Sequence, residues 1–204
     1  MKLKQLFGSV FSTPEVAQKV APKVEVETVL IKYGIKKYTI NNDLTVDVDG
    51  DVIFSPNADL KNIPVNFGTV SGSFECKYNH IVSLEGAPKE VGGHFFCSYN
   101  QLSSLSGSPR GVGGNFNCDN NRLTSLQGAP REVGGDFYCY NNQLTSLQGG
   151  PREVGGSFSC FKNQLITLKG SPREVGGNFY CDSNKLTSLD GIGNVRSNIR
   201  SDLS

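Results

Sequence analysis

Residues 136–156 read DFYCYNNQLTSLQGGPREVGG, and the next 21 residues, SFSCFKNQLITLKGSPREVGG, repeat most of these letters. The same spacing extends in both directions, because a cysteine recurs every 21 residues at Cys76, Cys97, Cys118, Cys139, Cys160 and Cys181. A fixed period of about 20 to 29 residues is typical of a solenoid, whose turns bury their apolar side chains only against neighbouring turns. The repeat therefore predicts a mainly β, single-domain solenoid with a short-stranded parallel sheet.

Within one turn, side chains are expected to alternate along a strand, so that Phe95 and Cys97 point inward while Phe96 and Ser98 point outward. The six cysteines then act as small buried hydrophobic residues and form the structural core together with the phenylalanines. A disulfide ladder and a zinc site are less favoured alternatives, because the spacing has no C-x-x-C pair and neither histidine keeps step with the cysteines.

An asparagine follows each cysteine by three residues, where the chain leaves the strand. Its amide is expected to bond backbone groups that the turn leaves unpaired, as buried backbone requires. The structural asparagines singled out in this way are Asn100, Asn121, Asn142 and Asn163.

The chain divides into four parts on this reading: an arm at 1–37, a β-hairpin cap with a degenerate first repeat at 38–72, six repeats at 73–192, and a polar tail at 193–204. The cap is expected to turn at Asp49-Gly50, a pair that favours tight hairpin turns. A calcium loop at Asp47, Asp49 and Asp51 is disfavoured, because an EF-hand loop requires glycine at its sixth position and glutamate at its twelfth.

The arm carries Leu3, Leu6, Phe7, Val10 and Phe11 at helical spacing, with Pro14 and Pro22 as expected breaks. It is predicted to be either a loose terminus or a short amphipathic helix that docks on a partner. No stretch approaches the roughly 20 apolar residues that span a membrane, so no membrane insertion is expected.

The repeat resembles the leucine-rich repeat family, whose L-x-x-L-x-L-x-x-N-x-L core it matches from the fourth position as Phe95, Cys97, Asn100 and Leu102. Glycine stands at the first position, so extended or turn-like segments, and no helices, are expected on the return side. The amino-acid sequences of the repeats, such as NQLTSL at 142–147 and PREVGG at 130–135, resemble those of short repeat proteins encoded by large tailed bacteriophages.

The resemblance implies a binding surface on a concave strand face. The outward positions beside the cysteines vary from turn to turn while the core positions stay constant. Aromatic residues gather there, and clustered aromatic side chains are typical of protein-interface hot spots. The predicted partner-binding residues are Phe96, Tyr138, Tyr140, Phe161 and Tyr180. The alternative interpretation is that aromatic residues simply suit β-strands.

A second column of residues follows the prolines: Lys89, Arg110, Arg131, Arg152 and Arg173, with a glutamate beside all but Arg110. Its alternating signs predict a self-neutralising, solvated edge. With 20 basic and 19 acidic residues, the composition gives no sign of nucleic-acid binding. No catalytic constellation, cofactor motif or metal-ligand spacing stands out.

The sequence therefore predicts a non-enzymatic, protein-binding solenoid that acts as an adaptor or inhibitor of a viral or bacterial protein. The alternative is a structural or decoration component of a bacteriophage particle attached through residues 1–37. The expected location is the cytoplasm of the infected bacterial host or, for the alternative, the virion.

Overall fold

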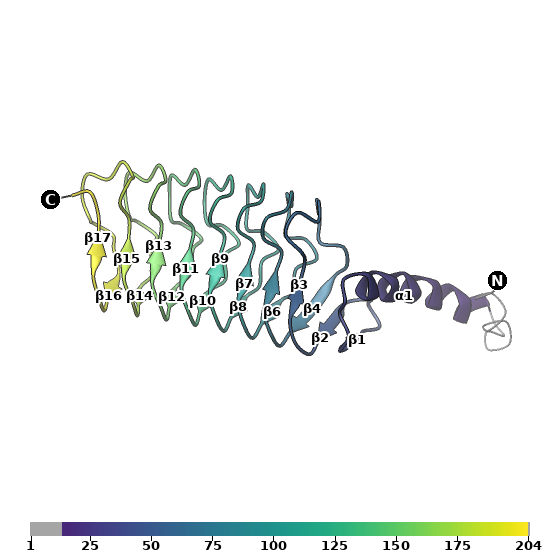
Figure 1. Cartoon of the computed structure of the whole chain (residues 1–204). Helices are drawn as coiled ribbons and strands as arrows, with labels where there is room; N and C mark the ends of the chain where they lie inside the picture. The colour runs from purple at the N-terminus through teal and green to yellow at the C-terminus, as the bar shows by residue number, and fades with distance from the viewer. Residues whose placement is uncertain (1–13, 204) are drawn as a thin grey trace.

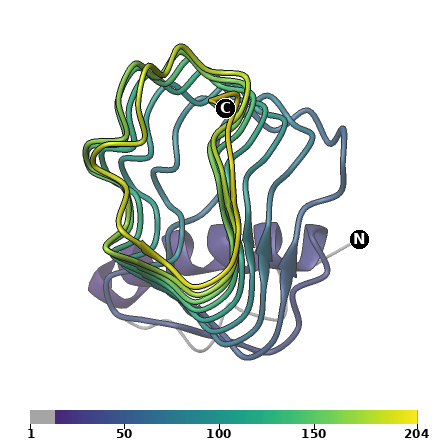
Figure 2. The same cartoon turned by 90° about the vertical axis from the view of Figure 1, so that its left-hand side faces the viewer.

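The structure is a computed structural model that describes residues 14–203 in backbone and residues 22–203 in side-chain detail. It is a single parallel β-solenoid of about seven turns (Figure 1). A 19-residue helix, α1 (Pro14–Lys32), precedes it. Viewed from the C-terminal end, successive turns superpose closely (Figure 2). This confirms the predicted mainly β solenoid with short parallel strands.

Each turn contributes one short strand to each of two sheets. The strands of the first, here called the valine sheet, are β1 (Tyr38–Ile40), β2 (Val46–Val48), β4 (Phe67–Val70), β6 (Glu90–Val91), β8 (Gly111–Val112), β10 (Glu132–Val133), β12 (Glu153–Val154), β14 (Glu174–Val175) and β16 (Asn194–Val195). The strands of the second, the phenylalanine sheet, are β3 (Val52–Ile53), β5 (Phe74–Glu75), β7 (Phe95–Phe96), β9 (Phe116–Asn117), β11 (Phe137–Tyr138), β13 (Phe158–Ser159), β15 (Phe179–Tyr180) and β17 (Ile199–Arg200).

Register between turns is kept by the 21-residue period. Phe137 pairs with Phe116 on one side and with Phe158 on the other, and Val133 lies in the same way between Val112 and Val154. The valine sheet occupies the return side of each turn, where the sequence predicted extended segments without helices.

The phenylalanines of successive turns stack along the axis of the solenoid. Ring centroids from Phe116 to Phe137 are 5.2 Å apart with planes 6° from parallel, and from Phe137 to Phe158 they are 5.4 Å apart. Identical side chains in register must stack in this way, and an offset stack adds to the burial of each ring. The cysteines and two leucines of each full turn, with Ile81 as one of the pair in the first, complete the core, and every core phenylalanine from Phe74 to Phe179 is fully buried.

The asparagines satisfy backbone groups at the end of each phenylalanine-sheet strand. The amide nitrogen of Asn121 donates to the carbonyls of Cys97 and Cys118, both at 3.1 Å, and to that of Asp119 at 3.3 Å. Its oxygen accepts the backbone N–H of Leu102 at 3.0 Å. One side chain thus bonds groups of two successive turns, which fixes the bend where the strand ends.

The paired glycines after each valine are required by the close approach of turns. A Cβ atom on Gly134 would lie 2.1 Å from the carbonyl oxygen of Gly113, and one on Gly155 would lie 2.2 Å from that of Gly134. No real Cβ contact is that short, so the backbones can stack here only if the position carries no side chain.

The N-terminal end of the stack is closed by α1 and the β1–β2 hairpin. Leu30 is fully buried, and the ring of Tyr33 meets that of Phe54 edge-on at 4.9 Å. The helix runs through Pro22, so the prediction of a break there is wrong; Pro14, in contrast, stands at the helix start, where its missing N–H costs nothing. The predicted helix at Leu3–Phe11 lies outside the described residues.

The hairpin exists, but not with the predicted turn. Strands β1 and β2 pair antiparallel around residues 41–45, where the N–H of Leu44 donates to the carbonyl of Asn41 at 3.0 Å. Asp49-Gly50 instead forms the corner from the valine sheet to the phenylalanine sheet. Gly50, at φ 124°, supplies the positive dihedral angle that the corner needs.

The polar segment at 193–204 also differs from the prediction of a loose tail. Asn194 pairs with Glu174 and Ile199 with Phe179, so that β16 and β17 add one more turn. Backbone hydrogen bonds form this turn although the characteristic residues of the repeat are absent from it. The hydrogen-bond ladder depends on strand register and not on side-chain identity.

Replacing Asn121 with alanine should destabilise the protein by about 1–3 kcal/mol, because the N–H of Leu102 then loses its acceptor. The carbonyls of Cys97, Cys118 and Asp119 each lose one donor and keep another, from Asn100, Asn142 and the N–H of Tyr99. Urea unfolding followed by far-UV circular dichroism measures the change. Gln143→Ala is the matched control, since this exposed side chain should be replaceable at no measurable cost. Equal stability of the Asn121 and Gln143 variants would contradict the role assigned to the asparagine.

Candidate functional site

The outer face of the phenylalanine sheet carries the predicted partner-binding residues. Four of them, Tyr138, Tyr140, Phe161 and Tyr180, come from three successive turns and gather around one hollow of about 580 Å³. The rings of Tyr140 and Phe161 stack at 4.5 Å, and those of Tyr138 and Tyr140 lie tilted at 6.2 Å. These four residues are called the aromatic cluster below.

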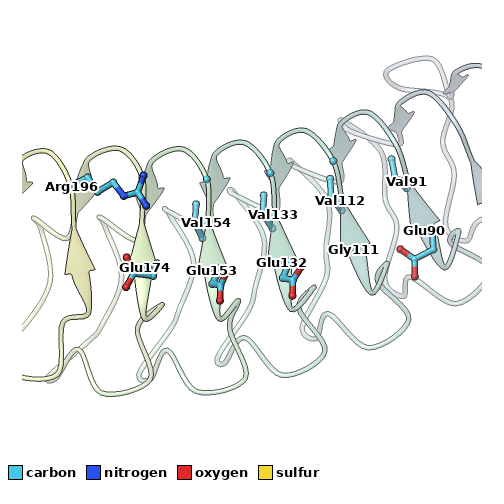
Figure 3. A pocket seen from close by; sticks show the side chains of 14 residues that line it. Glu90, Val91, Gly111, Val112, Glu132, Val133, Glu153, Val154, Glu174 and Arg196 are labelled. Carbon is cyan, nitrogen blue, oxygen red and sulfur yellow. The ribbon is translucent and has the colours of Figure 1, made fainter.

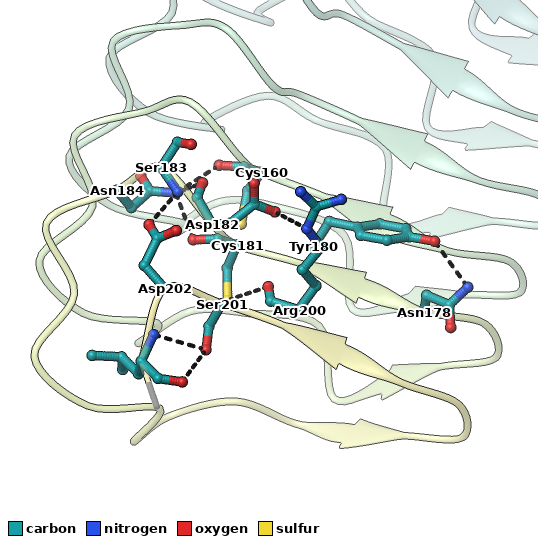
Figure 4. Close-up of polar contacts among 11 residues, drawn as sticks. Cys160, Asn178, Tyr180, Cys181, Asp182, Ser183, Asn184, Arg200, Ser201 and Asp202 are labelled. Atoms are coloured by element: carbon teal, nitrogen blue, oxygen red, sulfur yellow. Dashed lines mark hydrogen bonds and ion pairs between the residues drawn. The ribbon is translucent and has the colours of Figure 1, made fainter.

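The cluster is held by polar neighbours, and each of its four residues is partly buried. The Tyr138 hydroxyl donates to Asp136 at 2.8 Å. The Tyr180 hydroxyl accepts from Asn178 at 3.0 Å, as Figure 4 shows for this pair. Burial, with Asp136 nearby, raises the pKa of Tyr138 to about 12. Rings fixed in this way lose little conformational entropy when a partner binds.

Charged side chains border the cluster at its C-terminal side. The Arg200 guanidinium lies 3.4 Å from the Asp182 carboxylate, as Figure 4 shows, and both residues line the hollow together with Lys162. Lys162 also lies over the Phe161 ring, 6.0 Å from its centroid. The hollow thus combines apolar ring surface with fixed hydrogen-bonding groups of both signs.

Phe96, the fifth predicted residue, lies apart from the cluster. Its ring stacks on His94 at 5.3 Å, and the Lys77 ammonium sits over it at 5.2 Å while pairing with Glu75 at 2.9 Å. It lines a second hollow, of about 260 Å³, which Tyr140 separates from the first.

Two tyrosines that the sequence reasoning missed also line the second hollow. Tyr78 and Tyr99 stack at 4.3 Å and are each 44% exposed, more than any residue of the aromatic cluster. Both have left-handed backbone angles, with φ of 56° and 55°. The sequence does indicate the left-handed bend, because the equivalent position in later turns is Asn120 and Asn141, and asparagine favours that conformation.

The outer face of the valine sheet is the other candidate surface. Glu132, Glu153 and Glu174 stand in register over a hollow of about 620 Å³ with a glycine floor, and Arg196 lies at its end (Figure 3). Both the glutamates and the adjacent arginine column are exposed to solvent, and no ion pair between described side chains joins them.

The cysteines form an unreactive column. All six are free and buried, and burial raises the pKa of each thiol, well above its ordinary value for Cys97, Cys118, Cys139 and Cys160. For Cys76 the value is about 12 and for Cys181 about 11. The thiolate, which is the reactive form, is therefore scarce at neutral pH.

The aspartates considered for calcium bind backbone instead. Asp47 accepts the N–H of Thr69 at 2.7 Å and the Asn41 amide at 2.9 Å, and these bonds lower its pKa. Asp51 accepts the N–H of Ser73 at 2.7 Å. Within the part of the chain that the structure describes, no group of three or more histidine, cysteine or acidic side chains could hold a metal ion.

In comparisons with known proteins, no family model, no curated protein and no solved structure matches this chain. The architecture established here is a parallel β-solenoid with repeats of about 21 residues. Within the described residues, no helix is long and apolar enough to cross a membrane.

Alkylation of the native protein at pH 8 should be slow at all six cysteines and should reach Cys181 first. Cys181 is covered only by the terminal turn, and its pKa is raised least among those with a value, so it forms thiolate more readily than Cys76. Peptide mass spectrometry after timed alkylation gives the order. Protein unfolded in urea is the control, in which all six should react alike. Rapid labelling of Cys118 in the native protein would contradict the buried column.

Proposed function

We propose that this protein is a non-enzymatic binding protein that recognises a protein partner through the outer face of its phenylalanine sheet. The observation that carries the proposal is the aromatic cluster, four rings from three turns around one hollow with Asp182 and Arg200 at its border. Tyrosine and arginine are the residues most enriched among interface hot spots, where they bury large area at low entropic cost.

The composition of the face supports the same role. Tyrosine, serine, asparagine and aspartate fill most outward positions of β7 to β15 and the residues that flank them, as in antibody paratopes. The inward positions repeat from turn to turn, whereas these outward positions differ. A constant framework with a varied surface suits selection for binding one partner, and aromatic preference for strands alone does not account for the polar residues beside the rings.

The partner proposed is a bacterial or viral protein, and the protein acts as an adaptor or inhibitor in the cytoplasm of an infected bacterium. This choice of partner and location rests on the resemblance of the repeat sequences to those of leucine-rich-repeat-like proteins of large tailed bacteriophages.

A second candidate is a decoration component of a phage particle, docked through the N-terminal segment. It is favoured by α1, where Val24 and Ile31 are 50% and 72% exposed while Leu30 of the same helix is buried in the end of the stack. Val24 and Ile31 are seven residues apart and so share one side of the helix, about 100° around the axis from the packed Leu30. Mass spectrometry of purified particles separates the candidates, because a decoration protein is present in stoichiometric amount.

Replacing Tyr138, Tyr140, Phe161 and Tyr180 together with serine should abolish capture of the partner. Each interface anchor contributes about 2 kcal/mol or more, so loss of even two weakens a complex several hundredfold. Affinity capture from infected cells, followed by quantitative mass spectrometry, measures the loss.

The matched control is Val24→Lys with Ile31→Lys, which changes the exposed side of α1 and leaves Leu30 in place. This variant should bind the partner normally. If it fails to bind and the four-serine variant succeeds, the docking role of the N-terminal segment replaces the proposed function. Circular dichroism verifies that both variants keep the β-solenoid.

A further inference from the structure

The second hollow on the same face contains a buried carboxylate without a cation. Asp119 is only 2% exposed, and its oxygens accept the Ser98 hydroxyl and the Asn120 amide, both at 2.7 Å. No lysine, arginine or histidine side chain described in the structure lies within ion-pair distance of it. Buried carboxylates are normally paired with a cation, because neutral donors offset only part of the lost hydration.

The Asp119 carboxylate contributes to the raised pKa values of neighbouring groups. Burial, followed by the nearby Asp119 carboxylate, raises the pKa of Tyr140 to about 12. Asp119 also contributes to the raised pKa values of Cys97, Cys118 and Cys139. Lys77, the one lysine that lines the hollow, is already held by Glu75 at 2.9 Å.

A second acceptor in the hollow lacks a donor. The side-chain oxygen of Asn117 is buried and has no hydrogen-bond partner, and Asn117 and Asp119 line the hollow together. The walls are aromatic: Tyr78, Tyr99 and Phe96 on one side and Tyr140 on the other. An acceptor without a donor and a carboxylate without a cation, within aromatic walls, match a flat cation that carries several donors.

We propose that this hollow binds an arginine side chain of the protein partner, an inference that rests on the binding role proposed for the face. A guanidinium stacks on tyrosine rings and donates up to five hydrogen bonds, so it can serve Asp119 and Asn117 together. A lysine ammonium offers neither the planar stacking nor the fork of donors.

The backbone supplies an independent argument that Tyr78 and Tyr99 serve recognition. Their left-handed conformation disfavours tyrosine and favours asparagine, which stands at this position in two later turns, while Lys162 and Ser183 adopt the same conformation in the other two. Tyrosine there is costly for the fold, and the two rings remain half-exposed. Strained residues of this kind cluster where a protein binds its ligand.

The test uses the full chain and no partner. N-acetylarginine amide is titrated into isotope-labelled protein while amide chemical shifts are followed by NMR, with N-acetylcitrulline amide as the neutral isostere. Saturable shifts with a millimolar dissociation constant are expected for the arginine compound only, confined to residues around Tyr78, Tyr99 and Asp119. Equal shifts with the citrulline compound, or none with either, would overturn the inference.

Three variants sharpen the result. Asp119→Asn should weaken arginine binding about tenfold, because a hydrogen bond to a charged acceptor is lost. Tyr99→Asn should weaken it about threefold while suiting the backbone, which keeps the test valid if Asp119→Asn unfolds. Ile166→Ser, at an exposed position that lines neither hollow, is the control that should bind arginine as the parent does. Unchanged affinity in Tyr99→Asn would contradict the assigned site.

The outcome is separable from that of the proposed function. If arginine binds as expected but the four-serine variant still captures the partner, the proposed function fails at the cluster and the arginine site stands. If the four-serine variant loses its partner and arginine does not bind, only this inference fails.

Discussion

The structure depends on hydrogen bonding between successive turns. In the phenylalanine sheet the N–H of Cys118 donates to the carbonyl of Tyr138 one turn later, and in the valine sheet the N–H of Arg131 donates to the carbonyl of Arg110 one turn earlier. In the central turns paired residues are 21 positions apart, and a one-residue slip of this pairing would turn the inward side chains of a strand outward. The end turns differ in length, since Val52 pairs with Phe74 and Phe179 with Ile199, so the 21-residue period accounts for the asparagine, glycine and phenylalanine columns of the central turns.

This constraint explains which features could be predicted from the sequence. Residues that repeat, such as Phe137, Cys139 and Asn142, were assigned correctly to the core because repetition and burial have one cause, contact with an identical neighbour. The hairpin turn and the last turn were misassigned because they lie where repetition fails. At residues 41–45 the chain turns without glycine or proline. At 194–200 backbone pairing continues although the characteristic residues of the repeat are absent.

The candidate site was predicted less completely, for a different reason. Alternation of side chains along the strand places Tyr138 and Tyr140 on the outer face, and this placement can be predicted from the sequence. Alternation alone does not give the left-handed bend after each strand, which turns Tyr78 and Tyr99 onto the same face. Nor does it show that Asp119, at an outward position, is covered by its neighbours. Coverage of that kind depends on the sizes of side chains in adjacent turns and not on periodicity.

The same architecture separates stability from recognition. Each inward column is continuous, so a change such as Asn121→Ala affects two turns of the stack, whereas each outward position touches mainly the surface of its own turn and the next. Outward residues can therefore differ between turns without disturbing the ladder. A tyrosine at a bend that favours asparagine, and a carboxylate buried without a cation, are both unfavourable for the isolated chain. Their occurrence side by side, in a molecule whose core repeats so strictly, is most simply explained if a bound group compensates both.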